Sequence, residues 1–316
     1  MKKTVSVVLT VVLTAALLCT AVFAGEAELS HGRLKTFMKA ADALCDLYRV
    51  YDYGDYSDEI FDLVAEMYPE TVMDSYEGQP VCLLASEEQV TAAAKAKWDY
   101  LSDKTLEEFF FSGLRFYCLT EDGRYELETH AHGGGLPGSF SAKGILCGYT
   151  VDDNGVCRLY YSTRYAKETA NEYLGSHADA FWEEVVKLDY PAEIKYDHGT
   201  FVESQGDYYH IVQDCRAFEF KLSTDGLAEY VTDEYITGFP VSMTYIAGDI
   251  NGDGEVDNKD VVTLFKYLSG VDLHVNSFML DTNGDTEADN KDIVQLFKFC
   301  SGDKTITLND TPSFKG

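Results

Sequence analysis

The chain has 316 residues, of which 46% are hydrophobic, and its formal net charge is −29. That length and apolar content can build one large domain with a small one, or two domains of medium size. The negative charge argues against nucleic acid and anionic lipid as partners, because both would be repelled, whereas divalent cations would be attracted.

Residues 1–24 have the pattern of a secretory signal peptide. Met1-Lys2-Lys3 is a short basic start, residues 4–23 are apolar and uncharged, and Val22 and Ala24 stand at the two positions that a signal peptidase inspects. This pattern predicts cleavage after Ala24 and a secreted, extracellular protein without membrane insertion. The alternative is a retained membrane anchor, since about 20 apolar residues can span a bilayer. No basic stop-transfer cluster follows the segment, which favours cleavage.

Residues 30–101 are expected to be helical. Residues 58–67 form a second short helix that ends before Pro69, and Ser86 to Gln89 is a capping box that begins a third. The first helix is indicated by apolar residues at helical spacing on one face, namely Leu34, Phe37, Met38, Ala41 and Tyr48.

Alternating apolar residues then predict antiparallel hairpins. Residues 114–129 would turn at Glu121-Asp122-Gly123, residues 145–161 at Asp153-Asn154-Gly155, and residues 208–231 at Asp225-Gly226. Residues 179–188 return to helical spacing, and residues 241–246 are again β-like. Helices followed by an antiparallel meander predict an α+β domain over residues 25–246, ahead of a separate segment at residues 247–316.

The chain contains eight cysteines, and Cys19 would leave with the signal peptide. The odd number that remains predicts at least one free or intermolecular thiol. No Cys-x-x-Cys pair or Cys/His metal spacing is present. We therefore assign no disulfide from the sequence.

The C-terminal segment contains an internal repeat. Two stretches of 22 residues, Asp249 to Gly270 and Asp281 to Gly302, are offset by 32 positions. The aligned residues are identical at 15 of the 22 positions. Agreement at that level indicates duplication of one structural unit.

Each repeat begins with oxygen-bearing residues at the spacing of a calcium loop. Such a loop takes ligands from its first, third, fifth, seventh, ninth and twelfth positions. The first loop offers Asp249, Asn251, Asp253, the carbonyl of Glu255, Asp257 and Asp260. The second offers Asp281, Asn283, Asp285, the carbonyl of Glu287, Asp289 and Asp292. The carboxylates of each loop repel one another without a cation, so the sequence predicts two Ca²⁺ ions and calcium-dependent folding.

The alternative is a pair of acidic Asx-turns in exposed loops, because the same residues favour turns. The residues after each loop argue against it. Apolar residues follow at helical spacing in both copies, so that each loop leads into an amphipathic helix and the two apolar faces can bury each other. They are Val261, Leu264, Phe265 and Leu268 in one copy, and Ile293, Leu296, Phe297 and Cys300 in the other.

Two loop–helix units without a helix before each loop, and with Asp at the twelfth position, resemble the type I dockerin family. The resemblance covers about 55 residues and implies a small all-α module. It also implies binding to a cohesin module of a scaffoldin in a cellulosome-like complex, with the tenth and eleventh loop positions contributing to partner choice. The implied partner contacts are Asn258, Lys259, Lys266, Asn290, Lys291 and Lys298. One residue departs from the pattern: Thr286 stands where the first loop has Gly254.

No catalytic residue is predicted for residues 25–246. His132 to Gly135 is similar to an esterase oxyanion loop, but no G-x-S-x-G elbow accompanies it. His130 and His132 could bind a metal, but no third ligand follows at the spacing of a metal site. Glu126 and Glu128 could serve as the two carboxylates of a glycosidase, but the acidic chain offers many such pairs. The 22 tyrosines could stack on sugars or serve as strand residues.

The dockerin resemblance alone implies a role in polysaccharide catabolism. An enzyme of this kind would be a hydrolase acting on O-glycosyl or ester bonds of plant polysaccharide. The alternative is a non-catalytic carbohydrate-binding, inhibitory or assembly protein with polysaccharide as a possible partner.

Overall fold

The computed structural model describes residues 29–53, 58–128, 144–162, 201–205, 208–240, 242–271 and 273–312. The predicted signal peptide, the helix expected at residues 179–188, and both His130 and His132 lie outside the described residues. Backbone contacts divide the chain into two units, Met1–Leu34 and Lys35–Gly316. Among the described helices, none is both long and apolar enough to cross a membrane.

The first half of the chain is mainly helical, as expected. Helices α2 (His31–Tyr53), α3 (Asp58–Met67) and α4 (Glu87–Lys97) confirm the three predicted helices. The capping box is also confirmed, because the Ser86 hydroxyl accepts the Gln89 N–H and the Gln89 side chain accepts the Ser86 N–H. Leu34, Phe37 and Ala41 are buried along α2, in agreement with the helical spacing.

A small sheet interrupts this helical region, which the sequence analysis did not predict. After the 3₁₀ turn η1 (Pro69–Thr71), strands β1 (Val72–Tyr76) and β2 (Gln79–Ser86) form a hairpin. Its two turn residues, Glu77 and Gly78, both have positive φ, which is the geometry of a type I′ turn. Strand β2 pairs with β3 (Arg124–Glu128), about 40 positions further along the chain. A pairing at that separation leaves no signal in local periodicity.

The hairpin predicted at residues 114–129 is wrong in its first half. Helix α5 (Asp103–Leu106), the π-helical turn η2 (Glu107–Phe111) and α6 (Ser112–Cys118) follow one another without a break. This helical run buries Phe109, Phe110, Phe111 and Leu114, and the burial of these large side chains outweighs the short alternating pattern. Only β3 remains as a strand of the expected hairpin.

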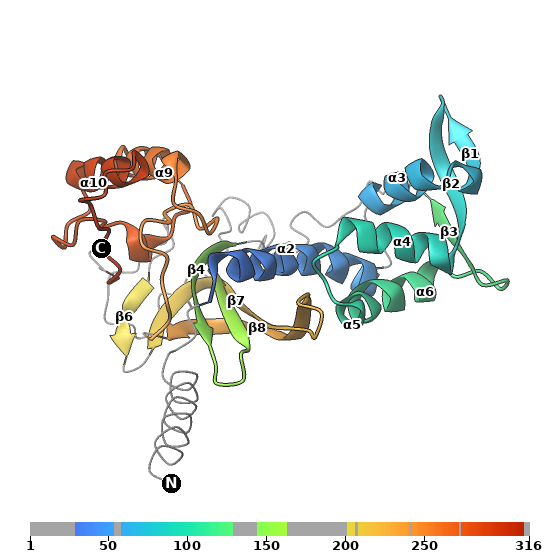
Figure 1. Ribbon diagram of the computed structural model, residues 1–316, viewed down its shortest axis with the longest axis horizontal. Helices are drawn as coiled ribbons and strands as arrows, with labels where there is room; N and C mark the ends of the chain where they lie inside the picture. The colour runs from blue at the N-terminus through green and yellow to red at the C-terminus, as the bar shows by residue number, and fades with distance from the viewer. Residues whose placement is uncertain are drawn as a thin grey trace, which may run out of the picture. The chain divides into compact units, whose positions relative to one another are not determined.

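The second sheet is antiparallel and confirms the other two predicted hairpins. Strands β4 (Ile145–Val151) and β5 (Cys157–Ser162) pair across the expected turn, and β7 (Tyr208–Leu222) pairs with β8 (Ala228–Pro240). The order is β4-β5-β7-β6, with β6 (Phe201–Gln205) pairing with the start of β7 and β8 pairing along it. Figure 1 shows α2 beside this sheet, and the Phe37 ring stacks on Phe220 with centroids 5.8 Å apart.

The C-terminal segment is built from α9 (Asn258–Leu268), the 3₁₀ turn η5 (Ser277–Met279) and α10 (Asn290–Cys300). Figure 1 shows α9 and α10 side by side. Of the residues expected to be β-like, the described ones, 242–246, contribute an isolated bridge between Thr244 and Tyr149. One hydrophobic core continues from the second sheet into this segment, so it crosses the boundary predicted between residues 246 and 247. Its buried members include Cys147, Tyr160, Phe239, Ile250, Leu264, Phe278 and Leu296.

Candidate functional site

The first carboxylate of each repeat organises its loop from a buried position. Asp249 has no exposed surface, and its two oxygens accept the N–H groups of Asp253 at 3.1 Å and Gly254 at 2.9 Å. Asp281 is 3% exposed and accepts the N–H groups of Asp285 at 3.1 Å and Thr286 at 2.8 Å. The two loops therefore close around equivalent carboxylates.

The twelfth residue of each loop ties the loop to its helix. The Asp260 carboxylate accepts the N–H groups of Ile250, Asn251 and Asp257 at 2.8 to 3.0 Å. Asp292 does the same for Asn283 at 3.1 Å and Asp289 at 2.8 Å. Both residues occupy the third helical position of a capping box whose N-cap is the ninth loop residue, Asp257 or Asp289.

The third, fifth and seventh positions form successive Asx-turns. In the first loop, Asn251 Oδ1 accepts the Asp253 N–H at 2.8 Å, and Asp253 Oδ1 accepts the Glu255 N–H at 3.0 Å. In the second loop, Asn283 Oδ1 accepts the Asp285 N–H at 2.9 Å, and Asp285 Oδ1 accepts the Glu287 N–H at 3.0 Å. These turns give the third, fifth and seventh positions of the two loops the same backbone geometry.

The buried carboxylates of the loops favour a bound cation. Burial raises the pKa of Asp249 to about 8, with the neighbouring carboxylates of Asp260 and Asp253 adding to the shift. Burial also raises the pKa of Asp260 and of Asp292. A buried carboxylate keeps its charge at neutral pH when a hard cation lies beside it, and Ca²⁺ prefers the oxygen donors present here. The donor set therefore fits calcium.

The predicted contact residues Lys259 and Lys291 lie against the loops. Lys259 Nζ is 3.1 Å from Asp253 and 3.4 Å from Asp257, and Lys291 Nζ is 2.9 Å from Asp285 and 3.1 Å from Asp289. Each lysine thus neutralises part of the loop charge from the exposed side.

Thr286 adopts the conformation that glycine has in the first loop. Its φ is 71°, against 78° for Gly254. Both residues donate their N–H to the first-position carboxylate. A β-branched residue is strained in this left-handed region. Threonine in place of glycine at position 286 therefore adds backbone strain to the second loop.

The predicted burial of the two helices against each other is correct only in part. Leu264 and Leu296 are fully buried, but Phe265 is 57% exposed and Phe297 is 54% exposed. Val262 and Val294 are also exposed, at 49% and 50%. The exposure of these four side chains was not predicted from the sequence. Their matching positions in the two repeats could have indicated a shared surface role.

Together these residues form two exposed faces at matching positions of the repeats, named the docking faces after the role expected from the sequence. The α9 face consists of Asn258, Lys259, Val262, Phe265 and Lys266, and the α10 face consists of Asn290, Lys291, Val294, Phe297 and Lys298. All ten residues are exposed. Exposed apolar residues ringed by cations are typical of a protein-binding surface.

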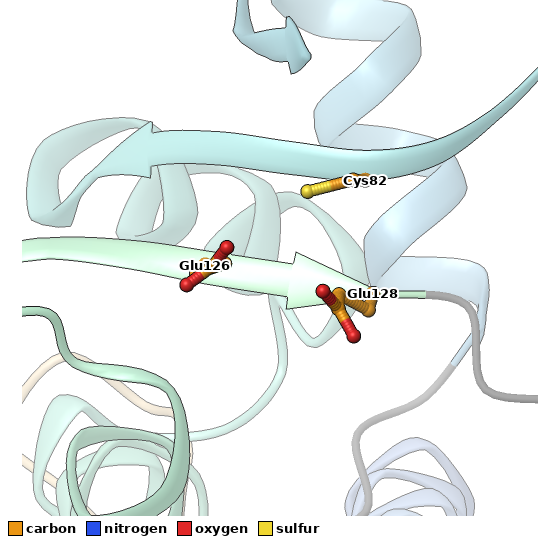
Figure 2. Close-up of side chains that lie close together, drawn as sticks. All are labelled: Cys82, Glu126 and Glu128. Carbon is orange, nitrogen blue, oxygen red and sulfur yellow. The ribbon is translucent and has the colours of Figure 1, made fainter. Parts of the chain in front are cut away.

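A second cluster of ligand-type side chains lies on the small sheet. Figure 2 shows Cys82 on β2 and the carboxylates of Glu126 and Glu128 on β3. One ligand atom from each of the three lies within 4.8 Å of the others. Burial and these two carboxylates raise the pKa of the Cys82 thiol. Both carboxylates leave the same face of β3.

Two further expectations concern aromatic residues and thiols. Tyr160 and Tyr161 are 4% and 3% exposed, so they are strand core residues and not sugar-stacking platforms. Within the described part of the chain, no two cysteines form a disulfide.

The paired loops and helices define the C-terminal segment as a duplicated loop–helix module of the calcium-binding kind. Residues 247–299 match the family model for the dockerin type I domain, and this segment is a type I dockerin domain. Type I dockerins bind calcium and the cohesin modules of scaffoldins, so the domain implies a cohesin-binding assembly of the cellulosome type. Neither a curated protein nor a solved structure matches the chain.

Proposed function

We propose that the protein is an exported component of a cellulosome-type complex, held there by calcium-dependent binding of its dockerin to a cohesin. Residues 1–24 would direct export, residues 25–246 would be the cargo, and residues 247–316 would be the anchor. The observation that carries the docking proposal is the pair of matched docking faces, because a surface duplicated at a 32-residue offset can meet one partner in two orientations.

Two calcium ions would occupy the module, one in each loop. The first would be held by Asp249, Asn251, Asp253, Asp257, Asp260 and the Glu255 carbonyl. The second would be held by Asp281, Asn283, Asp285, Asp289, Asp292 and the Glu287 carbonyl. Calcium would neutralise the buried first and twelfth carboxylates and so fix the helices that carry the docking faces.

Binding would depend on the exposed phenylalanines at the centre of each face. Alanine at Phe265 or Phe297 removes an aromatic anchor of the kind that contributes about 2 kcal/mol or more at an interface, or roughly 30-fold in affinity. Either single variant should keep binding through the other face, whereas the double variant should lose it.

Calorimetric titration with a scaffoldin cohesin in calcium tests this proposal. Phe116→Ala is the matched control, because Phe116 is 80% exposed but lies on α6, outside the dockerin. Unchanged affinity of the double variant would show that the docking faces are not the binding surface. Binding that persists in excess chelator would remove calcium from the proposal.

The cargo would serve polysaccharide breakdown, as a hydrolase of O-glycosyl or ester bonds. That proposal is supported by the dockerin alone, and a panel of plant polysaccharides and esters tests it through released sugar or acid.

The second candidate is a non-catalytic carbohydrate-binding protein. It is favoured by an exposed aromatic pair on α6, where Phe116 and Tyr117 are 80% and 49% exposed and their ring centroids lie 4.8 Å apart. Exposed rings of this kind can stack on sugars. Retention of the wild-type chain on insoluble polysaccharide, lost on replacing both rings with alanine, would favour binding over hydrolysis.

A further inference from the structure

The first calcium loop lies against the α+β part of the chain. The Leu146 N–H on β4 donates to the Gly252 carbonyl at 3.1 Å. A Cβ added to Gly252 would come within 2.5 Å of Ile145 Cβ. The fourth position of the loop is thus held in backbone contact with the edge strand of the second sheet.

Neighbouring residues extend this contact on both sides. Glu255, at the seventh loop position, forms an ion pair with Lys35 on α2. Asn276 donates its backbone N–H to Ile250 at 2.8 Å and its side-chain amide to Leu146 at 3.4 Å, and it is almost fully buried. The loop, α2 and β4 are therefore joined by hydrogen bonds as well as by the shared core.

The contact between the first loop and the α+β domain is not continuously packed. A cavity of about 420 Å³ remains between α2, the start of β4 and the loop, with Lys35, Ile145 and Asn251 in its wall. The bonds from Leu146 and Asn276 therefore add to the shared core in holding the loop against β4, and these bonds need the loop to keep its shape.

The second loop has different neighbours. Gly284 is the equivalent of Gly252, and a Cβ there would meet nothing closer than 3.6 Å, the side chain of Asn309. Asn309 also donates its N–H to Thr282 at 2.9 Å and its side-chain amide to Asp281 at 3.0 Å. The contacts seen for this loop in the described residues thus come from the dockerin itself.

We propose that calcium in the first loop stabilises the β4 edge of the α+β domain, whereas calcium in the second loop does not. Burial raises the pKa values of Cys147 on β4 and Tyr161 on β5, and the carboxylate of the fully buried Asp249 adds to both shifts. A cation at that carboxylate offsets the cost of burying its charge and fixes the loop that bonds to Leu146. Cargo and anchor would then form one calcium-linked folding unit.

This inference rests on the calcium part of the proposed function, and hydrogen exchange of the full chain separates the two. Exchange of a peptide covering Ile145–Val151 would be measured with and without calcium, in Asp249→Asn and in the matched variant Asp281→Asn. The number of bound ions would be measured in the same samples. If opening of the edge requires release of the ion, calcium at 100 times its Kd slows exchange by up to about 100-fold.

Wild type and Asp281→Asn should show this slowing, and Asp249→Asn should lose it. Bound calcium without any change at β4 overturns the inference but leaves the proposed function intact. Absence of bound calcium overturns both.

A second matched pair keeps the test valid if Asp249→Asn folds poorly. Gly252→Ala and Gly284→Ala place the same residue at similar positive φ, 67° and 79°. Both variants carry the backbone strain, but only the first forces a clash with Ile145. Faster β4 exchange in calcium for Gly252→Ala alone supports the inference, and equal behaviour of the two variants contradicts it.

Discussion

Replacing Thr286 with glycine should tighten calcium binding in the second loop. Threonine at φ 71° carries the steric cost of the left-handed region, roughly 1–2 kcal/mol. Glycine removes that cost but loses more backbone entropy on ordering, roughly 0.5–1 kcal/mol. The net gain is about 1 kcal/mol, or roughly fivefold in calcium affinity.

The reverse change, Gly254→Thr, is the matched control in the first loop. It adds the same backbone strain, and its Cβ would also lie 2.5 Å from Met38 Sδ. The first loop should therefore lose more affinity than the second gains. Competition with a chromophoric chelator resolves the two sites and measures both changes. If Thr286→Gly leaves affinity unchanged or weakens it, the strain assigned to Thr286 is wrong.

The remaining predictions concern the core and the thiols. Leu264→Ala and Leu296→Ala, both at fully buried positions, should each lower the free energy of unfolding by about 2–5 kcal/mol, measured by urea titration in calcium, whereas Val262→Ala at an exposed position should change it little. A short iodoacetamide pulse at pH 8, followed by mass spectrometry, should label the half-buried Cys82 before the buried Cys157. Burial raises the pKa of Cys157 to about 12, so its reactive thiolate is scarce until the protein unfolds, and labelling of Cys157 in the native protein would contradict the fold.

The two loop–helix units could be predicted from the sequence because their structure is local. Asp249 bonds to residues four and five positions away, and Asp260 closes the loop across ten. Residue spacing therefore contains nearly all the information needed to place these side chains. The same holds for the capping box of α4 and the hairpin turns of the second sheet.

The errors arose where distant contacts decide the structure. The β1–β2 hairpin depends on β3 for its second partner, and the π-helical turn before α6 is stabilised by burial of three consecutive phenylalanines. Phe265 follows Leu264 on the same stripe of the helix, so periodicity cannot tell that only the leucine meets the core. Whether a stripe residue is buried depends on the shape of the surface opposite, which the sequence of the helix does not contain.

The surroundings of residues 254 and 286 differ. In the first loop, a Cβ at residue 254 would lie 2.5 Å from Met38 Sδ of α2, so the end of that flexible side chain would have to move, in addition to the cost of the positive φ. In the second loop, the Thr286 side chain is exposed, so the cost of threonine there is the backbone strain of its positive φ. The copy packed on the sheet is thus constrained by the neighbouring domain as well as by calcium, whereas the other copy is constrained by its own turn geometry. Two nearly identical sequences can therefore differ in how strongly they couple to the cargo while presenting the same docking face.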